Sequence, residues 1–283
     1  MFPFYVGPSI SSHTRFGATA GALLISLCAS VAQADSVSEG KSQLEKQEFT
    51  KAAETFAQGF DKGEGEAGFY LARMVELGVG FPADQEKARI LYLASAEKGS
   101  ASALNRLGLM HLRGENVRQD FVAAAELICK SADLGNVEGQ FNCGGLFLDG
   151  TGQQVNASTA FSYYQKAAVE GHVGAKNMLA IMTRQGTGTQ ADGKKALEMF
   201  TEVAALGNPV ALFNLAQIYE NGEGTPSSPI DAHLYYNLAN ERGHPNARTA
   251  LEALTATMTR EQLEEAQTRA RAWQATVEAS SKP

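Results

Sequence analysis

Small and large apolar residues alternate at helical spacing, and the pattern returns every 36 residues. Residues four apart lie on one face of an α-helix, so the stripe predicts one helix per period that packs closely against its neighbours. The small positions are Ala52, Ala88, Ala124, Ala160, Ala196 and Ala232, and the large ones are Phe56, Tyr92, Ile128, Tyr164, Phe200 and Tyr236. A second apolar series predicts another helix before each of five of these; it reads Leu71, Leu107, Cys143, Leu179 and Leu215.

Glycines separate the two predicted helices of each period. Glycine can close a helix in the left-handed conformation without Cβ strain. One ladder follows the second helices, at Gly63, Gly99, Gly135, Gly171, Gly207 and Gly243, and another follows the first helices, at Gly78, Gly114, Gly150, Gly186 and Gly222. Predicted N-caps then open the second helices, at Asp84, Asp120, Asn156, Asp192 and Ser228. A fixed period of this length indicates a helical repeat array.

The periodicity also divides the chain. We expect a signal peptide at residues 1–34, an N-terminal capping helix unit at residues 35–63, five repeats at residues 64–243, and a half-repeat with a capping helix at residues 244–283. Thr259 and Gln262 have the spacing of a capping box at the start of that last helix. The expected fold class is all-α, a right-handed α-solenoid of about five 36-residue helix-turn-helix repeats.

Three stretches carry a family resemblance. Residues 105–117 (NRLGLMHLRGENV) and 213–224 (FNLAQIYENGEG) resemble the opening of a Sel-1-like repeat, and residues 163–172 (YYQKAAVEGH) resemble its closing half. The family is related to the tetratricopeptide repeat, and the resemblance covers residues 64–255. It implies a scaffold that binds a protein or peptide on its concave face, with roles in cell-envelope assembly, exopolysaccharide processes or host contact.

The N-terminus indicates export. Arg15 is the only charged residue among the first 34, an apolar run covers residues 18–32, and Ala32-Gln33-Ala34 supplies a small-x-small cleavage pattern. We therefore expect a periplasmic or secreted protein with no membrane span after signal cleavage, although an uncleaved anchor stays open. The chain has 31 acidic and 24 basic residues, a net charge of −7, which argues against nucleic acid as a partner.

Cys129 and Cys143 are predicted to face each other, because they lie on successive helices at similar distances from the glycine between them. An oxidising compartment would allow a disulfide, and two buried free thiols are the alternative.

The sequence predicts no catalytic, cofactor or metal site. Ser38-Glu39-Gly40-Lys41 has the serine–lysine spacing of penicillin-recognising enzymes but lacks a later Lys-Thr-Gly, and the histidines lack metal-ligand spacing. A hydrolase acting on β-lactams or peptidoglycan is the alternative function, and a glycan-binding module is a third.

Binding is instead expected on the first helices. Alternating phenylalanines there are candidate anchors for an extended peptide, and the alternative is that they pack against neighbouring first helices. The candidate concave-face residues are Phe69, Arg73, Glu76, Asn105, Arg113, Phe141, Asp149, Asn177, Arg184, Phe213, Gln217 and Glu220.

Overall fold

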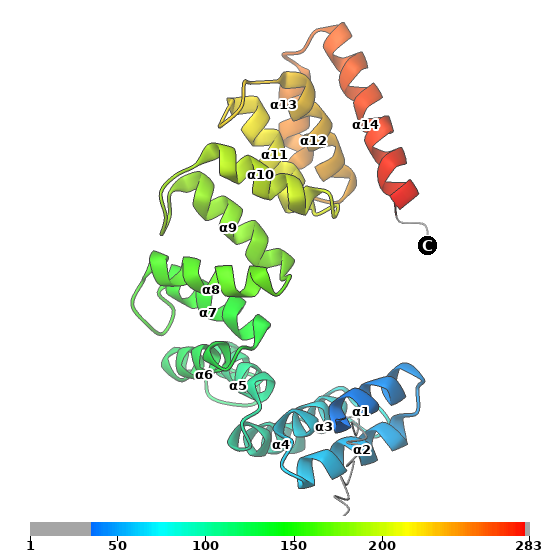
Figure 1. The fold of residues 1–283 in the computed structure, drawn as a ribbon, viewed down its shortest axis with the longest axis vertical. Coiled ribbons are helices and arrows are strands. Elements are labelled where there is room, and N and C mark those ends of the chain that lie inside the picture. Colours follow the sequence, from blue (N-terminus) through cyan, green and yellow to red (C-terminus); the bar gives the residue numbers. More distant parts are fainter. Residues whose placement is uncertain (1–34, 281–283) are drawn as a thin grey trace, which may run out of the picture. The chain divides into compact units, whose positions relative to one another are not determined.

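The structure is a computed structural model that describes residues 35–280. The predicted signal peptide lies outside the described residues. Every regular element from residue 35 to residue 280 is an α-helix (Figure 1). The helices are α1 (Ser36–Glu45), α2 (Phe49–Asp61), α3 (Gly65–Leu77), α4 (Gln85–Glu97), α5 (Ala101–Arg113), α6 (Phe121–Asp133), α7 (Val137–Asp149), α8 (Ala157–Val169), α9 (Val173–Gln185), α10 (Gly193–Ala204), α11 (Pro209–Asn221), α12 (Pro229–Glu241), α13 (Ala247–Thr255) and α14 (Arg260–Ser280).

The helices from α3 to α12 form five antiparallel hairpins, each packed on the next. The odd-numbered member of each hairpin is the predicted first helix, and α1 with α2 forms a hairpin before the five. Both α13 and α14 pack on α12. The predicted all-α solenoid of 36-residue repeats is therefore confirmed.

Local backbone chemistry sets the helix ends. In all five second helices the predicted cap side chain accepts a hydrogen bond from a backbone N–H of the first turn. Each first helix ends at a left-handed glycine, as at Gly78 (φ 71°) and Gly150 (φ 74°). The capping box at α14 also forms: the Thr259 N–H donates to Gln262 Oε1, and the Gln262 N–H donates to Thr259 Oγ1.

A second hinge glycine lets successive hairpins approach closely. A Cβ on Gly152 would lie 1.9 Å from the carbonyl oxygen of Phe121, where α6 begins. The corresponding hinge residue of the repeat before is Asn116, which adopts φ 57° and donates from Nδ2 to Gln85 Oε1 at 3.4 Å. This first junction between repeats thus has a side-chain contact where glycine usually stands.

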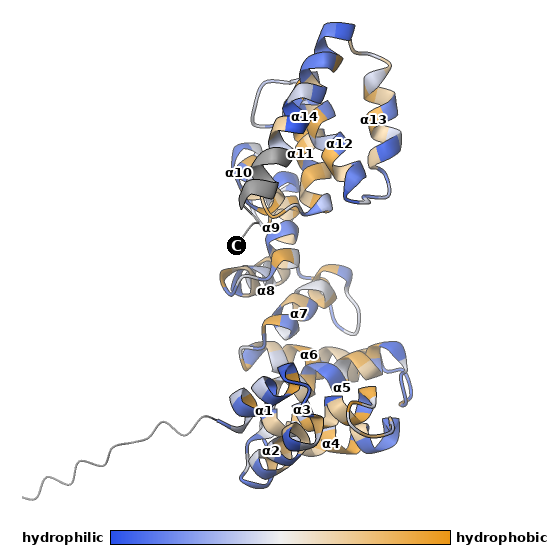
Figure 2. Ribbon diagram, turned by 90° about the vertical axis from the view of Figure 1, so that its right-hand side faces the viewer, coloured by the Kyte–Doolittle hydropathy of each residue, from blue (hydrophilic) through white to orange (hydrophobic). Residues whose placement is uncertain are grey.

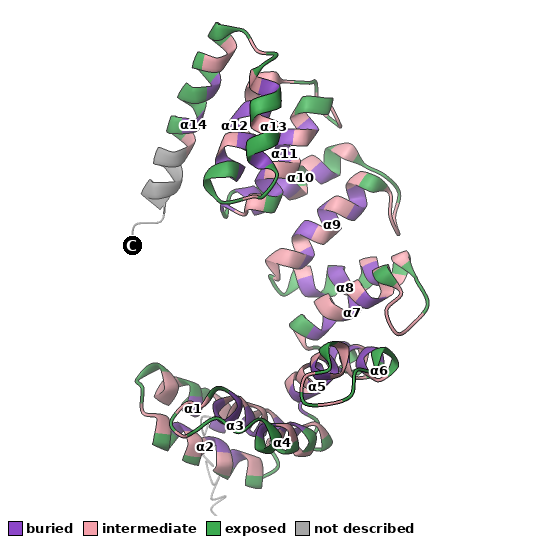
Figure 3. Ribbon diagram, turned by 180° about the vertical axis from the view of Figure 1, so that it is seen from behind, coloured by how far each residue is buried: buried purple, intermediate pink, exposed green. Residues whose placement is uncertain are grey.

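The predicted apolar stripe forms the core. None of its six alanines is more than 1% exposed, and none of its six large residues is more than 3% exposed. Figures 2 and 3 show hydrophobic and buried residues along the helix faces that meet other helices. Small residues between large ones allow the close packing on which the stack depends.

Cys129 of α6 and Cys143 of α7 are joined in the structure, with Sγ atoms 2.03 Å apart and Cα atoms 5.0 Å apart. The two helices belong to successive hairpins, so the disulfide ties one repeat to the next. No helix within residues 35–280 is both long enough and apolar enough to cross a bilayer.

Candidate functional site

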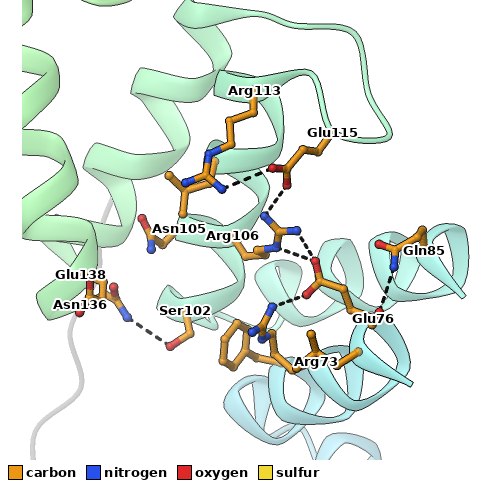
Figure 4. A pocket seen from close by; sticks show the side chains of 13 residues that line it. Arg73, Glu76, Gln85, Ser102, Asn105, Arg106, Arg113, Glu115, Asn136 and Glu138 are labelled. Carbon is orange, nitrogen blue, oxygen red and sulfur yellow. Dashed lines mark hydrogen bonds and ion pairs between the residues drawn. The ribbon is translucent and has the colours of Figure 1, made fainter. Parts of the chain in front are cut away.

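A groove of about 690 Å³ opens between α3, α5 and the start of α7 (Figure 4). It brings together five of the predicted binding residues, namely Phe69, Arg73, Glu76, Asn105 and Arg113. The rest of its lining is Leu77, Gln85, Ser102, Arg106, Leu109, Glu115, Asn136 and Glu138. The site therefore spans the first junction between repeats and reaches the second.

Glu76 lies at the centre of the groove wall and is only 8% exposed. Its carboxylate accepts hydrogen bonds from Arg73 Nη1 at 2.5 Å, from the Tyr92 hydroxyl at 2.6 Å and from Arg106 Nε at 2.9 Å, and also from Arg106 Nη2. Burial alone would raise the pKa of Glu76, but the hydrogen bonds from Arg106 and Tyr92 outweigh it and hold that pKa below its ordinary value. Glu76 is thus an ionised, fully bonded carboxylate.

Arg106 of α5 bridges two acidic groups. Besides Glu76 it donates from Nη1 to Glu115 Oε2 at 2.8 Å, and Arg113 Nη1 lies 3.3 Å from Glu115 Oε1. The hydrogen bond from Arg106 lowers the pKa of Glu115. Because Glu76 is on α3 and Arg106 on α5, the network holds two successive hairpins together along the groove.

The same three repeat positions form a second network three repeats later. There Arg184, Asn214 and Glu223 occupy the positions of Glu76, Arg106 and Glu115. Arg184 donates from Nη2 to Glu223 Oε1 at 2.7 Å, and from Nη1 to Asn214 Oδ1 at 3.3 Å and Gln217 Oε1 at 3.0 Å. The two central junctions have uncharged residues at these positions, namely Leu112, Asn142 and Thr151, then Leu148, Met178 and Thr187.

The alternating phenylalanines are half-buried and pack within the protein. Phe141 stacks on His172 with ring centroids 4.4 Å apart, and Phe213 stacks on His244 at 4.1 Å. Each of the three also contacts the core tyrosine of its own hairpin, at centroid distances of 5.3–5.8 Å. Phe69 also contacts Tyr70, the next residue on α3, at a centroid distance of 5.2 Å. Packing against neighbouring first helices, the alternative expected from the sequence, is supported at Phe141: His172 is the N-cap of α9, and a Cβ added to Gly174 of α9 would lie 3.2 Å from Phe141 Cε2.

The predicted asparagines, which alternate with these phenylalanines along the repeats, form hydrogen bonds with other asparagines. Asn105 accepts from Asn142 Nδ2 at 3.1 Å, and Asn177 donates from Nδ2 to Asn208 Oδ1 at 2.9 Å. Asn177 Oδ1 is buried without a hydrogen-bond partner within the described residues. Both predicted asparagines are at most 9% exposed, so only their edges reach the surface.

The predicted residues Asp149, Gln217 and Glu220 lie apart from the groove. Glu220 accepts from the Tyr236 hydroxyl at 2.7 Å, which repeats the Glu76–Tyr92 contact, and Gln217 belongs to the Arg184 network. Arg113 and Asp149 fall one residue beyond the repeat position of Glu76, and both are exposed. One residue turns a helix by about 100°, so these two point differently from Glu76.

Arg106 and Glu115 were not among the binding residues predicted from the sequence. The signal was present, because the position of Arg106 holds Tyr70, Asn142, Met178 and Asn214 in the other repeats, so a charge stands out there.

The serine–lysine motif lies on α1, where Ser38 and Lys41 are exposed. The ammonium of Lys41 lies 4.6 Å from the ring centroid of Tyr70, so its described contact is with an aromatic face. Among the described residues, no group of three His, Cys, Asp or Glu side chains is placed to hold a metal ion.

Comparison with known proteins identifies the repeat. The Sel1 repeat model matches residues 65–100, 101–136, 137–172, 173–208 and 209–244. Among solved structures, a Sel1 repeat protein from Oxalobacter formigenes is 24% identical with a TM-score of 0.71, and the match covers 82% of this chain and 97% of that one. A protective antigen present in uropathogenic Escherichia coli strains, which displays an SLR fold, is 22% identical with a TM-score of 0.55; that match covers 86% of this chain and 61% of the antigen.

Both structural likenesses concern the fold. No protein with a curated description matches the chain. Sel1 repeats generally mediate protein–protein interaction, in keeping with the scaffold that they build. Because five consecutive matches span residues 65–244, the chain belongs to the Sel1 repeat family.

Proposed function

We propose that this protein is an exported, non-catalytic scaffold that binds a segment of a partner protein in the groove between α3, α5 and the start of α7. The observation that carries the proposal is the groove itself, about 690 Å³ in volume, on the first-helix side of the repeats. Its export rests on the sequence of residues 1–34, and the Cys129–Cys143 bond would persist in an oxidising compartment. The envelope, exopolysaccharide and host-contact roles of similar proteins are the settings in which we expect it to act.

The groove has the mixed surface of a binding site. Leu77 is 60% exposed beside the buried Glu76 network, and Leu109 is half-buried next to it. Apolar contacts surrounded by polar groups are typical of protein interfaces. The ion pairs between α3 and α5 hold the walls in place, which reduces the ordering that a partner would otherwise have to bring about.

A photo-crosslinking experiment tests this directly. The photoreactive amino acid p-benzoylphenylalanine replaces Leu77 in the groove or, as a matched control, Ile90 on α4, which is 54% exposed and outside the groove. The full-length protein is then expressed in its native cells, irradiated and analysed by immunoblot. We expect a discrete adduct of higher mass from the Leu77 position alone. Equal adducts from both positions, or none from either, would contradict the proposal.

The absence of catalysis is tested with purified protein and nitrocefin. We expect no turnover above the buffer rate. Robust turnover that disappears in Ser38→Ala would instead assign the protein to the hydrolases.

A further inference from the structure

The geometry points to an acidic partner: we propose that the bound segment is an extended stretch of protein that places an Asp or Glu carboxylate between Arg73 and Arg113. This inference rests on the proposed function and specifies the chemistry of its ligand. Figure 4 shows the two arginines on opposite sides of Arg106.

The acceptors of the groove network are already occupied. Glu76 accepts four hydrogen bonds from three side chains. Both carboxylate oxygens of Glu115 also accept, one from Arg106 and one from Arg113. A partner that brought mainly donors would have to compete with these arginines for the same oxygens. The network therefore favours a ligand that brings acceptors.

Donors, in contrast, are available on two arginines. Arg73 donates to Glu76 through Nη1, and its side chain is 38% exposed. Arg113 makes one weak hydrogen bond within residues 35–280, to Glu115 at 3.3 Å, and is 59% exposed. Arg106 is different, because Nε, Nη1 and Nη2 all donate and the side chain is 17% exposed. Arg73 and Arg113 can each offer N–H groups to a carboxylate without breaking an internal bond.

The local charge of the groove also favours an acidic ligand. The three arginines exceed the two bonded glutamates by one positive charge, in a chain whose net charge is −7. Glu138 lies on the rim formed by α7, is 66% exposed and is 3.4 Å from His172 Nε2. The excess of positive charge is therefore confined to the part of the groove formed by α3 and α5, where it can attract a carboxylate over about a Debye length, roughly 8–10 Å at ordinary ionic strength.

The network at the fourth junction provides an internal comparison. Arg184 lies at the repeat position of Glu76, is 17% exposed, and donates through Nε, Nη1 and Nη2 to Glu223, Asn214 and Gln217. The guanidinium there is committed to internal partners. The network at the first junction thus has available donors, and the network at the fourth junction does not. An ion-pair network that served only to hold repeats together would not require available donors.

The groove also sets the length of the segment. Packed helices lie about 8–10 Å apart, so a segment that crosses from α3 past α5 to α7 covers roughly 20 Å, which is about six extended residues. Its carboxylate would lie between the two arginines, and an apolar neighbour would contact Leu77 or Leu109. An octapeptide is long enough to test this.

The test uses the full-length protein and a random octapeptide library displayed on phage. The best-selected peptide is synthesised with a fluorescein label, alongside the same peptide with each Glu or Asp changed to Gln or Asn. Affinities are measured by fluorescence anisotropy for the wild type, Arg113→Gln, and the double variant Arg73→Gln with Arg113→Gln. Arg248→Gln is the control, because Arg248 is 79% exposed on α13 and outside the groove.

We expect Asp or Glu enrichment among the selected peptides and at least a tenfold loss of affinity when the acidic residue is neutralised. Arg113→Gln and the double variant should lose a similar amount, and Arg248→Gln should stay within twofold of the wild type. Arg113 makes one weak hydrogen bond within residues 35–280, at 3.3 Å, so its substitution leaves the fold intact even if the double variant is destabilised.

Leu77→Ser distinguishes failure of the acidic ligand from failure of the proposed binding function. Peptides that lose affinity on Leu77→Ser but bind equally well after neutralisation would overturn the acidic ligand and leave the groove as a binding site. If no peptide is selected, or if selected peptides bind Leu77→Ser and the arginine variants like the wild type, both the acidic ligand and the proposed function are wrong.

Discussion

Replacing Glu76 by Leu removes the carboxylate on which the first network is centred. The substitution gives the first repeat the residue that the second and third repeats have at this position, Leu112 and Leu148. The new side chain therefore suits the fold, and the change acts through the charges that it leaves behind. Arg106, Arg73 and Tyr92 all lose an acceptor.

The magnitude follows from how buried these groups are. Breaking a buried ion pair by removing one partner costs about 3–5 kcal/mol. Arg106 is 17% exposed and keeps Glu115, while Arg73 is 38% exposed and can be hydrated. We therefore expect the free energy of unfolding to fall by about 2–3 kcal/mol, below the range for a fully buried pair.

A triple variant is the matched control. Glu76→Leu with Arg106→Asn and Glu115→Thr reproduces the set that the second junction has, namely Leu112, Asn142 and Thr151. Replacing a whole buried network by groups that pack is often nearly neutral, so we expect a loss of about 1 kcal/mol or less.

Urea unfolding followed by far-ultraviolet circular dichroism measures both variants. Because a repeat array can unfold in parts, hydrogen exchange of α3 and α5 reports on the first junction separately. A Glu76→Leu variant as stable as the wild type, or a triple variant that loses as much stability as the single one, would show that the charges left behind do not destabilise the protein.

Three further predictions concern the backbone, the disulfide and pH. In urea unfolding, Gly152→Ala should lower the unfolding free energy by at least about 1 kcal/mol more than Gly135→Ala. Both glycines have positive φ, but only at Gly152 would the new Cβ collide with backbone, 1.9 Å away. Equal losses would show that the close approach of Gly152 to Phe121 is unimportant. Reduction of the Cys129–Cys143 bond, which closes a loop with a separation of 14 residues, should lower the unfolding free energy by up to about 3 kcal/mol and make two more thiols available to alkylation, as measured by mass spectrometry. If the alkylated mass and the stability are the same with and without reductant, the two thiols are free. The pKa of Glu76 is depressed in the folded state, so the stabilisation that Glu76 contributes is present above its ordinary pKa of 4.5 and is lost as pH falls through the folded-state pKa. The difference in unfolding free energy between the wild type and Glu76→Leu should therefore narrow from about pH 6 to about pH 3, and a constant difference would contradict this.

Helix boundaries could be predicted because they depend on local chemistry. A glycine at Gly150 or a cap at Asp120 fixes φ or satisfies orphan N–H groups through neighbours in sequence. A period of 36 then places every copy, so the fold follows from patterns that contain no long-range information. The alanine stripe is also predictable, because position 160 and its equivalents must face another helix.

The groove required more than periodicity. Glu76, Arg106 and Glu115 meet because side chains from two hairpins extend toward one another, and their rotamers cannot be read from spacing. Arg113 and Asp149 lie one residue beyond the column of Glu76, and one residue changes the direction of a helical side chain by about 100°.

One contact that the sequence did contain was overlooked. Phe141 and His172 are 31 residues apart, as are Phe213 and His244, while Asn177 has Asn208 at the same spacing. In these three pairs phenylalanine goes with histidine and asparagine with asparagine, whereas Phe69 has Ser100 at this spacing. Comparing these two columns would have predicted the ring stacks at 4.4 and 4.1 Å.

Charge reversal at Arg113 is the sharpest test of the acidic ligand, since it asks whether one side chain of this groove meets one carboxylate of the partner. Anisotropy titrations would compare the wild type and Arg113→Glu, each with the selected acidic peptide and with the same peptide carrying Lys in place of its acidic residue. We predict that the wild type prefers the acidic peptide at least tenfold and that Arg113→Glu reverses the preference. If both proteins bound both peptides with the same affinities, the acidic segment would not lie in this groove.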